Sequence, residues 1–114
     1  AGEWRCRILK LGGLLPLTIY PDFRCRIVDD AGGLRIEKLT GSQRLSGVLY
    51  DLGEEARLGY AGALNYAEEP WIPYGRDPDR DQVGYLIPVA PDRMRLELPL
   101  PAFESRFDIL ELRR

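Results

Sequence analysis

Apolar and polar side chains alternate with a period of two along most of this chain, which is typical of half-buried β-strands. The alternation is clearest in residues 4–8 and 23–27, where an aromatic residue, a cysteine and an isoleucine alternate with two arginines. Residues 17–20 are expected to be extended, with residues 21–22 interrupting the chain after them. The pattern predicts eight strands, at residues 3–11, 23–28, 34–39, 44–50, 57–66, 83–89, 93–98 and 103–112.

Short connections favour pairing between sequence neighbours, and eight such strands most simply form a closed up-and-down barrel. We therefore expect one all-β domain over residues 1–114, a small eight-stranded antiparallel up-and-down barrel. A barrel of this size is filled by its own side chains or holds at most one small ligand, and the filled barrel is favoured. The side chains expected inside it are Trp4, Phe23, Ile27, Ile36, Tyr60, Tyr85 and Leu96.

Length and charge narrow the possible functions. The 114 residues suffice for one core, and the 16 basic and 18 acidic side chains give a net charge of −2. A general nucleic-acid binder is usually strongly basic, so no nucleic-acid partner is expected. No apolar run approaches the roughly 18 residues of a transmembrane helix, so no transmembrane segment is expected.

The chain contains two cysteines, Cys6 and Cys25, and no histidine. Structural zinc needs about four cysteine or histidine ligands, so we expect no metal site and no cofactor. Two interpretations remain: a disulfide, or two free thiols in the core of a cytosolic protein. The repeated strand favours the disulfide, because antiparallel pairing can bring the two sulfurs together. A disulfide in turn favours an oxidising compartment such as a bacterial periplasm.

The same two strands carry arginines on their other face. Pairing of the strands with opposed cysteines places these arginines side by side, and like charges across a strand pair are destabilising. Carboxylates on neighbouring strands are expected to neutralise them, with an anionic partner as the alternative. The arginines are Arg5, Arg7, Arg24 and Arg26, and the candidate carboxylates are Glu3, Asp22, Glu37, Asp108 and Glu111.

The alternation stops between residues 66 and 82, a proline-rich stretch of the kind that is often functional when it links strands in a compact domain. Trp71, Tyr74 and Arg76 are candidates for a recognition surface, because exposed aromatic and arginine side chains are favoured at interfaces. The alternative is that the loop folds back and its rings cover the end of the barrel. The aspartates at 77, 79 and 81 lack the glycine and glutamate of an EF-hand loop, so pairing with Arg76 and Arg80 or simple hydration is preferred over calcium.

A second candidate site is the turn at residues 38–44. Lys38, Ser42 and Arg44 surround a glycine, so the turn has the means to bind a phosphate or carboxylate through its bases and backbone N–H groups. It lacks the spacing of a phosphate-binding loop, and a plain hairpin connection is the alternative. No catalytic residue is expected, since the absence of histidine excludes Ser-His and Cys-His nucleophiles. Catalysis through paired carboxylates stays as an alternative.

Several longer motifs resemble the proteobacterial family known as domain of unknown function 4893. They are residues 5–12, 20–21, 23–27, 38–44, 74–77, 80–81, 103–105 and 108–112. The resemblance covers nearly the whole chain. It implies a secreted or lipid-anchored envelope protein from which a helical region and an export signal have been trimmed. It implies no established activity and no catalytic residues.

A shorter likeness concerns Gly2-Glu3-Trp4. Lipocalin-like barrels, including small periplasmic metalloprotease inhibitors, begin with a Gly-x-Trp strand whose tryptophan closes one end of the barrel. In many of them a late-strand arginine packs on this ring, a role open here to Arg93, Arg95 or Arg106. The likeness agrees with the expected eight strands.

These observations predict a non-catalytic bacterial envelope protein that acts as a protein-interaction or inhibitor-like binding module. We expect a monomer whose partner is another envelope protein. A lipocalin-like carrier of a small ligand is the first alternative, and an enzyme that uses carboxylates is the second. The first alternative requires a cavity, lined by residues such as Tyr60 and Tyr85.

Overall fold

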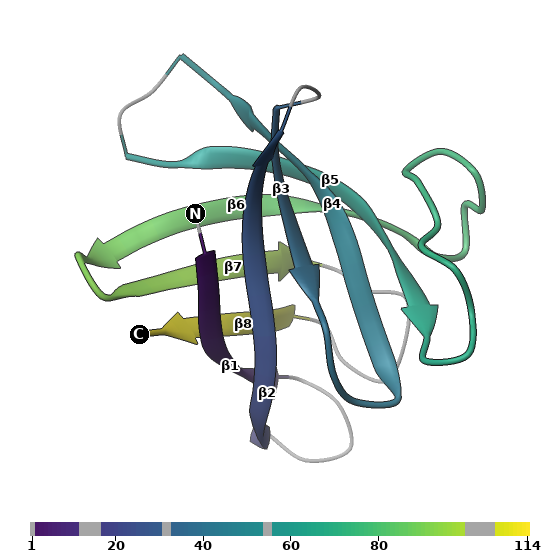
Figure 1. The fold of residues 1–114 in the computed structure, drawn as a ribbon, viewed down its shortest axis with the longest axis horizontal. Coiled ribbons are helices and arrows are strands. Elements are labelled where there is room, and N and C mark those ends of the chain that lie inside the picture. The colour runs from purple at the N-terminus through teal and green to yellow at the C-terminus, as the bar shows by residue number, and fades with distance from the viewer. Residues whose placement is uncertain (1, 12–16, 31–32, 54–55, 100–106) are drawn as a thin grey trace.

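The computed structural model describes residues 2–11, 17–30, 33–53, 56–99 and 107–114, which form eight antiparallel strands. Each strand pairs with its sequence neighbours, and β1 pairs with β8, so the sheet closes into an up-and-down barrel (Figure 1). The predicted all-β barrel is therefore confirmed. The strands are β1 (Gly2–Leu11), β2 (Leu17–Asp30), β3 (Gly33–Lys38), β4 (Gln43–Asp51), β5 (Leu58–Tyr66), β6 (Asp81–Ala90), β7 (Arg93–Pro99) and β8 (Phe107–Arg113).

Strand β2 is longer than the sequence pattern predicts. It runs unbroken through residues 21–22, where the prediction placed an interruption. The pairing register shifts at this point, because Cys6 lies opposite Phe23 whereas Ile8 lies opposite Tyr20. Two residues of β2 thus face one residue of β1, which is a β-bulge, and a bulge is where a strand tolerates proline.

The predicted disulfide between Cys6 and Cys25 is present, and it links β1 to β2 from inside the barrel. The two cysteines are diagonal rather than directly opposite, since Trp4 is the residue that faces Cys25. Their Cα atoms are 6.1 Å apart and both side chains are buried. Such a bond is compatible with an oxidising compartment outside the cytoplasm.

Carboxylates pair with three of the four arginines on the outer face of β1 and β2, namely Arg7, Arg24 and Arg26. Arg5 and Arg24 do face each other, so the predicted charge conflict exists. Glu111 on β8 forms a two-pronged pair with Arg7 at 3.1 and 3.2 Å, and Glu37 on β3 pairs with Arg26. Glu3 lies 3.7 Å from Arg24. Asp108 is not part of this stripe, because it faces the barrel interior.

The barrel interior is filled largely as expected. The buried apolar side chains are Trp4, Cys6, Cys25, Ile27, Ile36, Leu45, Leu49, Tyr60, Ala63, Leu64, Leu86, Leu96, Leu98, Leu110 and Leu112, among which Ala63 faces outward. Tyr60 fits at the centre because glycines at positions 47 and 62 leave room for its ring. Phe23 is half-buried and packs against this cluster.

Tyr85 is not inside the barrel, which corrects the prediction. It lies on the outer face of β6, where the Arg57 guanidinium lies 4.0 Å from the centre of its ring. The inner face of β6 carries Gln82, Gly84 and Leu86 instead, and all three are buried. The alternation places residues 83, 85 and 87 on one face of the strand, but a polar residue and a glycine on the inner face make the outer face look like the core.

The two ends of the barrel differ in chemistry. At one end the ring of Trp4 is buried, and the Arg114 guanidinium lies 4.2 Å from its centre. Arg114 thus occupies the position that the sequence suggested for Arg93 or Arg95, and Arg106 lies outside the described residues. At the other end the buried side chains include polar ones, among them Lys38, Gln82 and Asp108. None of the described residues forms an apolar helix of membrane-spanning length.

Candidate binding sites

The connection between β5 and β6, residues 67–80, is held in shape by its own polar contacts. The Glu69 carboxylate accepts a hydrogen bond from the Tyr66 amide at 2.8 Å and pairs with the Arg80 guanidinium. The hydrogen bond from Arg80, aided by that from the Tyr66 amide, holds the pKa of the Glu69 carboxyl below its usual range. The buried Asn65 side chain donates to the Tyr66 carbonyl at 3.0 Å. The base of the loop is therefore fixed.

Two aspartates accept hydrogen bonds from backbone amides near the tip of the same loop. Asp77 Oδ1 accepts a hydrogen bond from the Asp79 amide at 3.0 Å, and Asp77 Oδ2 lies 3.7 Å from Arg80 Nε. Asp81 Oδ1 accepts a hydrogen bond from the Gly75 amide at 2.9 Å. The expected pairing of this acidic loop with arginine is confirmed for Asp77 and Arg80. Among the described residues no group of carboxylates converges as metal ligands do.

The loop and the outer face of the barrel enclose a groove of about 340 Å³. Its lining residues are Arg35, Ser46, Gly47, Val48, Ala61, Trp71, Ile72, Pro73 and Tyr74. We call it the aromatic groove. Small side chains on β4 and β5 make its floor, so residues 71–74 can lie against the sheet without a bulky residue between them.

The two predicted recognition aromatics stand in the wall of the aromatic groove. Trp71 is 37% exposed and Tyr74 is 52% exposed, so neither ring is sealed against the barrel. Arg76 is exposed near the tip of the loop but does not line the groove. The structure thus brings Trp71 and Tyr74 together and leaves Arg76 outside.

The floor of the aromatic groove continues as an apolar row across neighbouring strands. Strand register places Arg35, Val48, Ala61 and Val83 side by side on the outer face of β3, β4, β5 and β6. Val48 and Val83 are 40% and 50% exposed. Arg35 forms one end of the row, and its guanidinium is 3.9 Å from Glu37, whose closer partner is Arg26. The groove therefore offers an apolar surface with a cation at one end.

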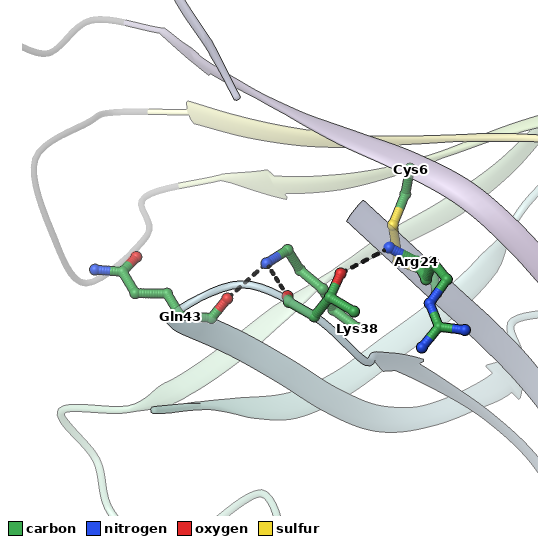
Figure 2. The surroundings of a disulfide bond; sticks show 6 residues. Cys6, Arg24, Lys38 and Gln43 are labelled. Carbon is green, nitrogen blue, oxygen red and sulfur yellow. Dashed lines mark hydrogen bonds between the residues drawn. A yellow bond between two sulfur atoms is a disulfide. The ribbon is translucent and has the colours of Figure 1, made fainter. Parts of the chain in front are cut away.

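In the second predicted site, the turn at residues 38–44, the two bases also make contacts within the turn itself. The Lys38 ammonium donates to the carbonyl of Thr40 at 2.8 Å and to that of Gln43 at 2.7 Å. Figure 2 shows the bond between Lys38 and Gln43. The ammonium also lies 3.7 Å from the centre of the Phe23 ring. Arg44 Nε donates to the Gly41 carbonyl at 3.0 Å. Both bases therefore hold backbone carbonyls of the turn.

Lys38 also lines two neighbouring chambers at the polar end of the barrel, which share Ile8, Lys10 and Gln43 in their lining and which we together call the barrel mouth. The outer chamber is about 290 Å³ in volume, and an inner chamber of about 30 Å³ lies beneath it. Burial, together with the nearby charges of Arg44 and Lys10, lowers the pKa of Lys38 to about 8. Ser42 borders the outer chamber and Arg44 the inner one.

Sequence reasoning missed several residues of the barrel mouth, notably Lys10, Tyr20, Gln82 and Asp108. A usable signal exists for two of them. Gln82 shares its strand parity with Leu86, and Asp108 shares its parity with Leu110 and Leu112, so both stand on inner faces. A polar residue in register with core leucines at a strand end indicates a polar barrel end.

Comparison with known proteins identifies one family. A family model described as a domain of unknown function (DUF4893) matches residues 1–112. No curated protein and no solved structure matches the chain.

Proposed function

The chain belongs to the DUF4893 family, and we propose that it is a non-catalytic binding module that recognises a protein partner through the aromatic groove. The observation that carries the proposal is the pair of exposed rings, Trp71 and Tyr74, held beside an apolar strand face by an internally bonded loop. Ordered aromatic side chains that border a pocket are frequent anchors of protein recognition. A loop fixed before binding also loses little conformational entropy on binding.

The mode of recognition follows from the closed barrel. The strands that form the floor of the aromatic groove are paired with one another through Arg35, Val48, Ala61 and Val83, so at this place they offer no free edge to an added strand. The partner therefore inserts side chains. An apolar side chain of the partner lies between the Trp71–Tyr74 wall and Val48, and an adjacent carboxylate of the partner meets Arg35 at the end of the row.

We place this interaction in an oxidising compartment of the bacterial envelope, with the protein acting as a monomer. The Cys6–Cys25 disulfide supports this placement. The proposal also assigns no reaction to the protein. The chain has no histidine, and several carboxylates, among them Glu37, Glu69 and Glu111, are engaged by arginines.

A carrier function is less well supported. The centre of the barrel is occupied by Tyr60 and a shell of leucines, and the inner chamber of about 30 Å³ has room for little more than a water molecule. A carrier that encloses its ligand needs several hundred cubic ångströms of interior space.

The test compares affinity columns made with the wild-type protein, the Trp71→Ala/Tyr74→Ala variant and the Tyr50→Ala variant. Tyr50 is 44% exposed on the outer face but does not line the aromatic groove, so its variant is the matched control. We expect an envelope protein to be retained by wild type and control and lost from the groove variant. Identical retention by all three columns, or no retained protein, contradicts the proposal.

A further inference from the structure

Lysine is restricted to the barrel mouth in this chain. The sequence has two lysines, Lys10 and Lys38, against 14 arginines, and both lysines line the same outer chamber. All ion pairs found among the described residues on the barrel surface use arginine. Lysine differs from arginine as a compact point charge that suits a single anionic group. The barrel mouth is therefore chemically distinct from the rest of the molecule.

The charges around the mouth do not balance. Lys10, Lys38 and Arg44 border the inner chamber, and Asp108 is the carboxylate among its described lining residues. Three cations against one carboxylate leave an excess of positive charge in a partly enclosed space. Lys38 is 1% exposed, and the low dielectric of such a site strengthens its attraction for an anion.

An unpaired polar group lies beside these cations. Gln82 is 9% exposed and lines the inner chamber, and its side-chain oxygen has no hydrogen-bond partner among the described residues. A buried amide oxygen without a partner is costly. The inner chamber has room for one bridging water molecule between this oxygen and a bound polar group.

The outer chamber adds an apolar wall. Ile8, Tyr20 and Phe23 line it together with the two lysines, and its 290 Å³ is near the lower limit for small-molecule sites. One face of the Phe23 ring is already used by the Lys38 ammonium. A ligand that fits both parts has one anionic group and a small apolar body.

We propose that the barrel mouth binds a small organic carboxylate, with its carboxylate beside Lys10 and Lys38 and its apolar body against Ile8, Tyr20 and Phe23. This site is on the inner side of the barrel end and is separate from the aromatic groove. The site opens to solvent through the outer chamber and leaves the packed barrel core unchanged. Its existence is independent of the protein partner, so either proposal can fail without the other.

The two lysines make the test specific. Protein labelled at the lysine side chains gives two side-chain NMR signals, both from the barrel mouth. Octanoate serves as the probe, with octanol as the same body without charge and inorganic phosphate as an anion without an apolar body. We expect octanoate to shift both lysine signals saturably, and octanol and phosphate to bind at least about tenfold more weakly.

Variants extend the test. Lys10→Met is expected to weaken octanoate binding by about tenfold or more, whereas Arg5→Met, which removes the same charge from the exposed outer wall, leaves the affinity unchanged. Lys38 is fully buried, so Lys38→Met is used only if its NMR spectrum shows a folded protein. The absence of a saturable shift in wild type overturns the proposal. Equal binding of octanoate and octanol, of octanoate and phosphate, or of octanoate to the two variants also overturns it.

Discussion

Tyr60 lies over Gly62 inside the barrel, so closely that a Cβ at position 62 would overlap both the Tyr60 hydroxyl and the Ser46 carbonyl. Protein cores tolerate such overlap poorly, at a cost of about 1–3 kcal/mol. We therefore predict that Gly62→Ala lowers the free energy of unfolding by about 1–3 kcal/mol in urea denaturation. A change below about 0.5 kcal/mol would show that the ring does not occupy this position.

For a second variant, Tyr60→Phe, we do not expect a loss of stability, because of the environment of the Tyr60 hydroxyl group. It is buried and has no hydrogen-bond partner among the described residues, and burial raises its pKa far above the usual range. Tyr60→Phe removes this group without changing the ring, so the free energy of unfolding should stay the same or rise by up to about 1 kcal/mol. A clear loss of stability in the same urea assay would indicate a hydrogen bond to the hydroxyl.

Because of the disulfide, the resistance of the protein to unfolding by urea should depend on whether a reductant is present. Cys6 and Cys25 are separated by 19 residues, and a crosslink over a loop of this size stabilises by roughly 3 kcal/mol. Unfolding in the presence of a reductant should therefore occur at a lower urea concentration than under oxidising conditions. The Cys6→Ala/Cys25→Ala variant is the control, because a reductant should leave its unfolding unchanged. Reductant-independent unfolding of the wild type would contradict a stabilising disulfide.

The lowered pKa of Lys38 should make the free energy of unfolding depend on pH. Its pKa is about 8 in the folded protein and 10.5 in the unfolded chain, so the unfolded chain binds more protons between these values. Stability must then rise as pH increases from about 8 towards 10.5. The unfolding free energy of the wild type, measured relative to Lys38→Met, should increase over the accessible part of this window. A constant difference would show that Lys38 has an ordinary pKa. A direct NMR pH titration of Lys38, with a midpoint near 8, provides the same test if the variant does not fold.

The contacts of Glu69 should protect the base of the loop at residues 67–80 from hydrogen exchange. Its carboxylate binds the Tyr66 amide and the Arg80 side chain, so Glu69→Gln should accelerate hydrogen exchange at the Tyr66 amide. Glu68→Gln, an exposed neighbour in the same loop, is the matched control. Because the folded pKa of Glu69 is lowered, protection should persist above the usual carboxyl range and disappear as pH falls through the lowered value. Equal exchange in the two variants would contradict this role.

Much of the fold can be read from the period-two pattern, because each strand pairs with the next strand along the chain. The bulge in β2 is harder to foresee. A proline followed by an aspartate usually ends a strand, and only the register against β1 shows that the strand continues. The inner face of β6 is also hard to predict from the sequence. Gly84 faces inward at a place where the backbone of Glu97 leaves no room for a side chain, and Tyr85 faces outward.

The aromatic groove and the barrel mouth differ in how much of each can be predicted from the sequence. Trp71 and Tyr74 stand out because their loop lacks any period, but the floor of the aromatic groove comes from small side chains that two strands, β4 and β5, bring together. The sequence identifies the bases of the 38–44 turn as candidate ligand groups. It does not reveal that their side chains also bind the turn's own carbonyls, because this depends on how the turn folds over Lys38. Lys10 and Asp108 reach the mouth only through barrel closure, because β1 pairs with β8.

The most direct test of the binding function places a photo-crosslinking amino acid in the aromatic groove in living bacteria. Val48 is the position inside the groove, and Val89, an exposed valine outside it, is the control. Recognition through the groove predicts a discrete crosslinked product of higher mass from position 48 that is absent from position 89 and is lost when Trp71→Ala/Tyr74→Ala is added. No product at position 48, or the same product at both positions, would contradict the account.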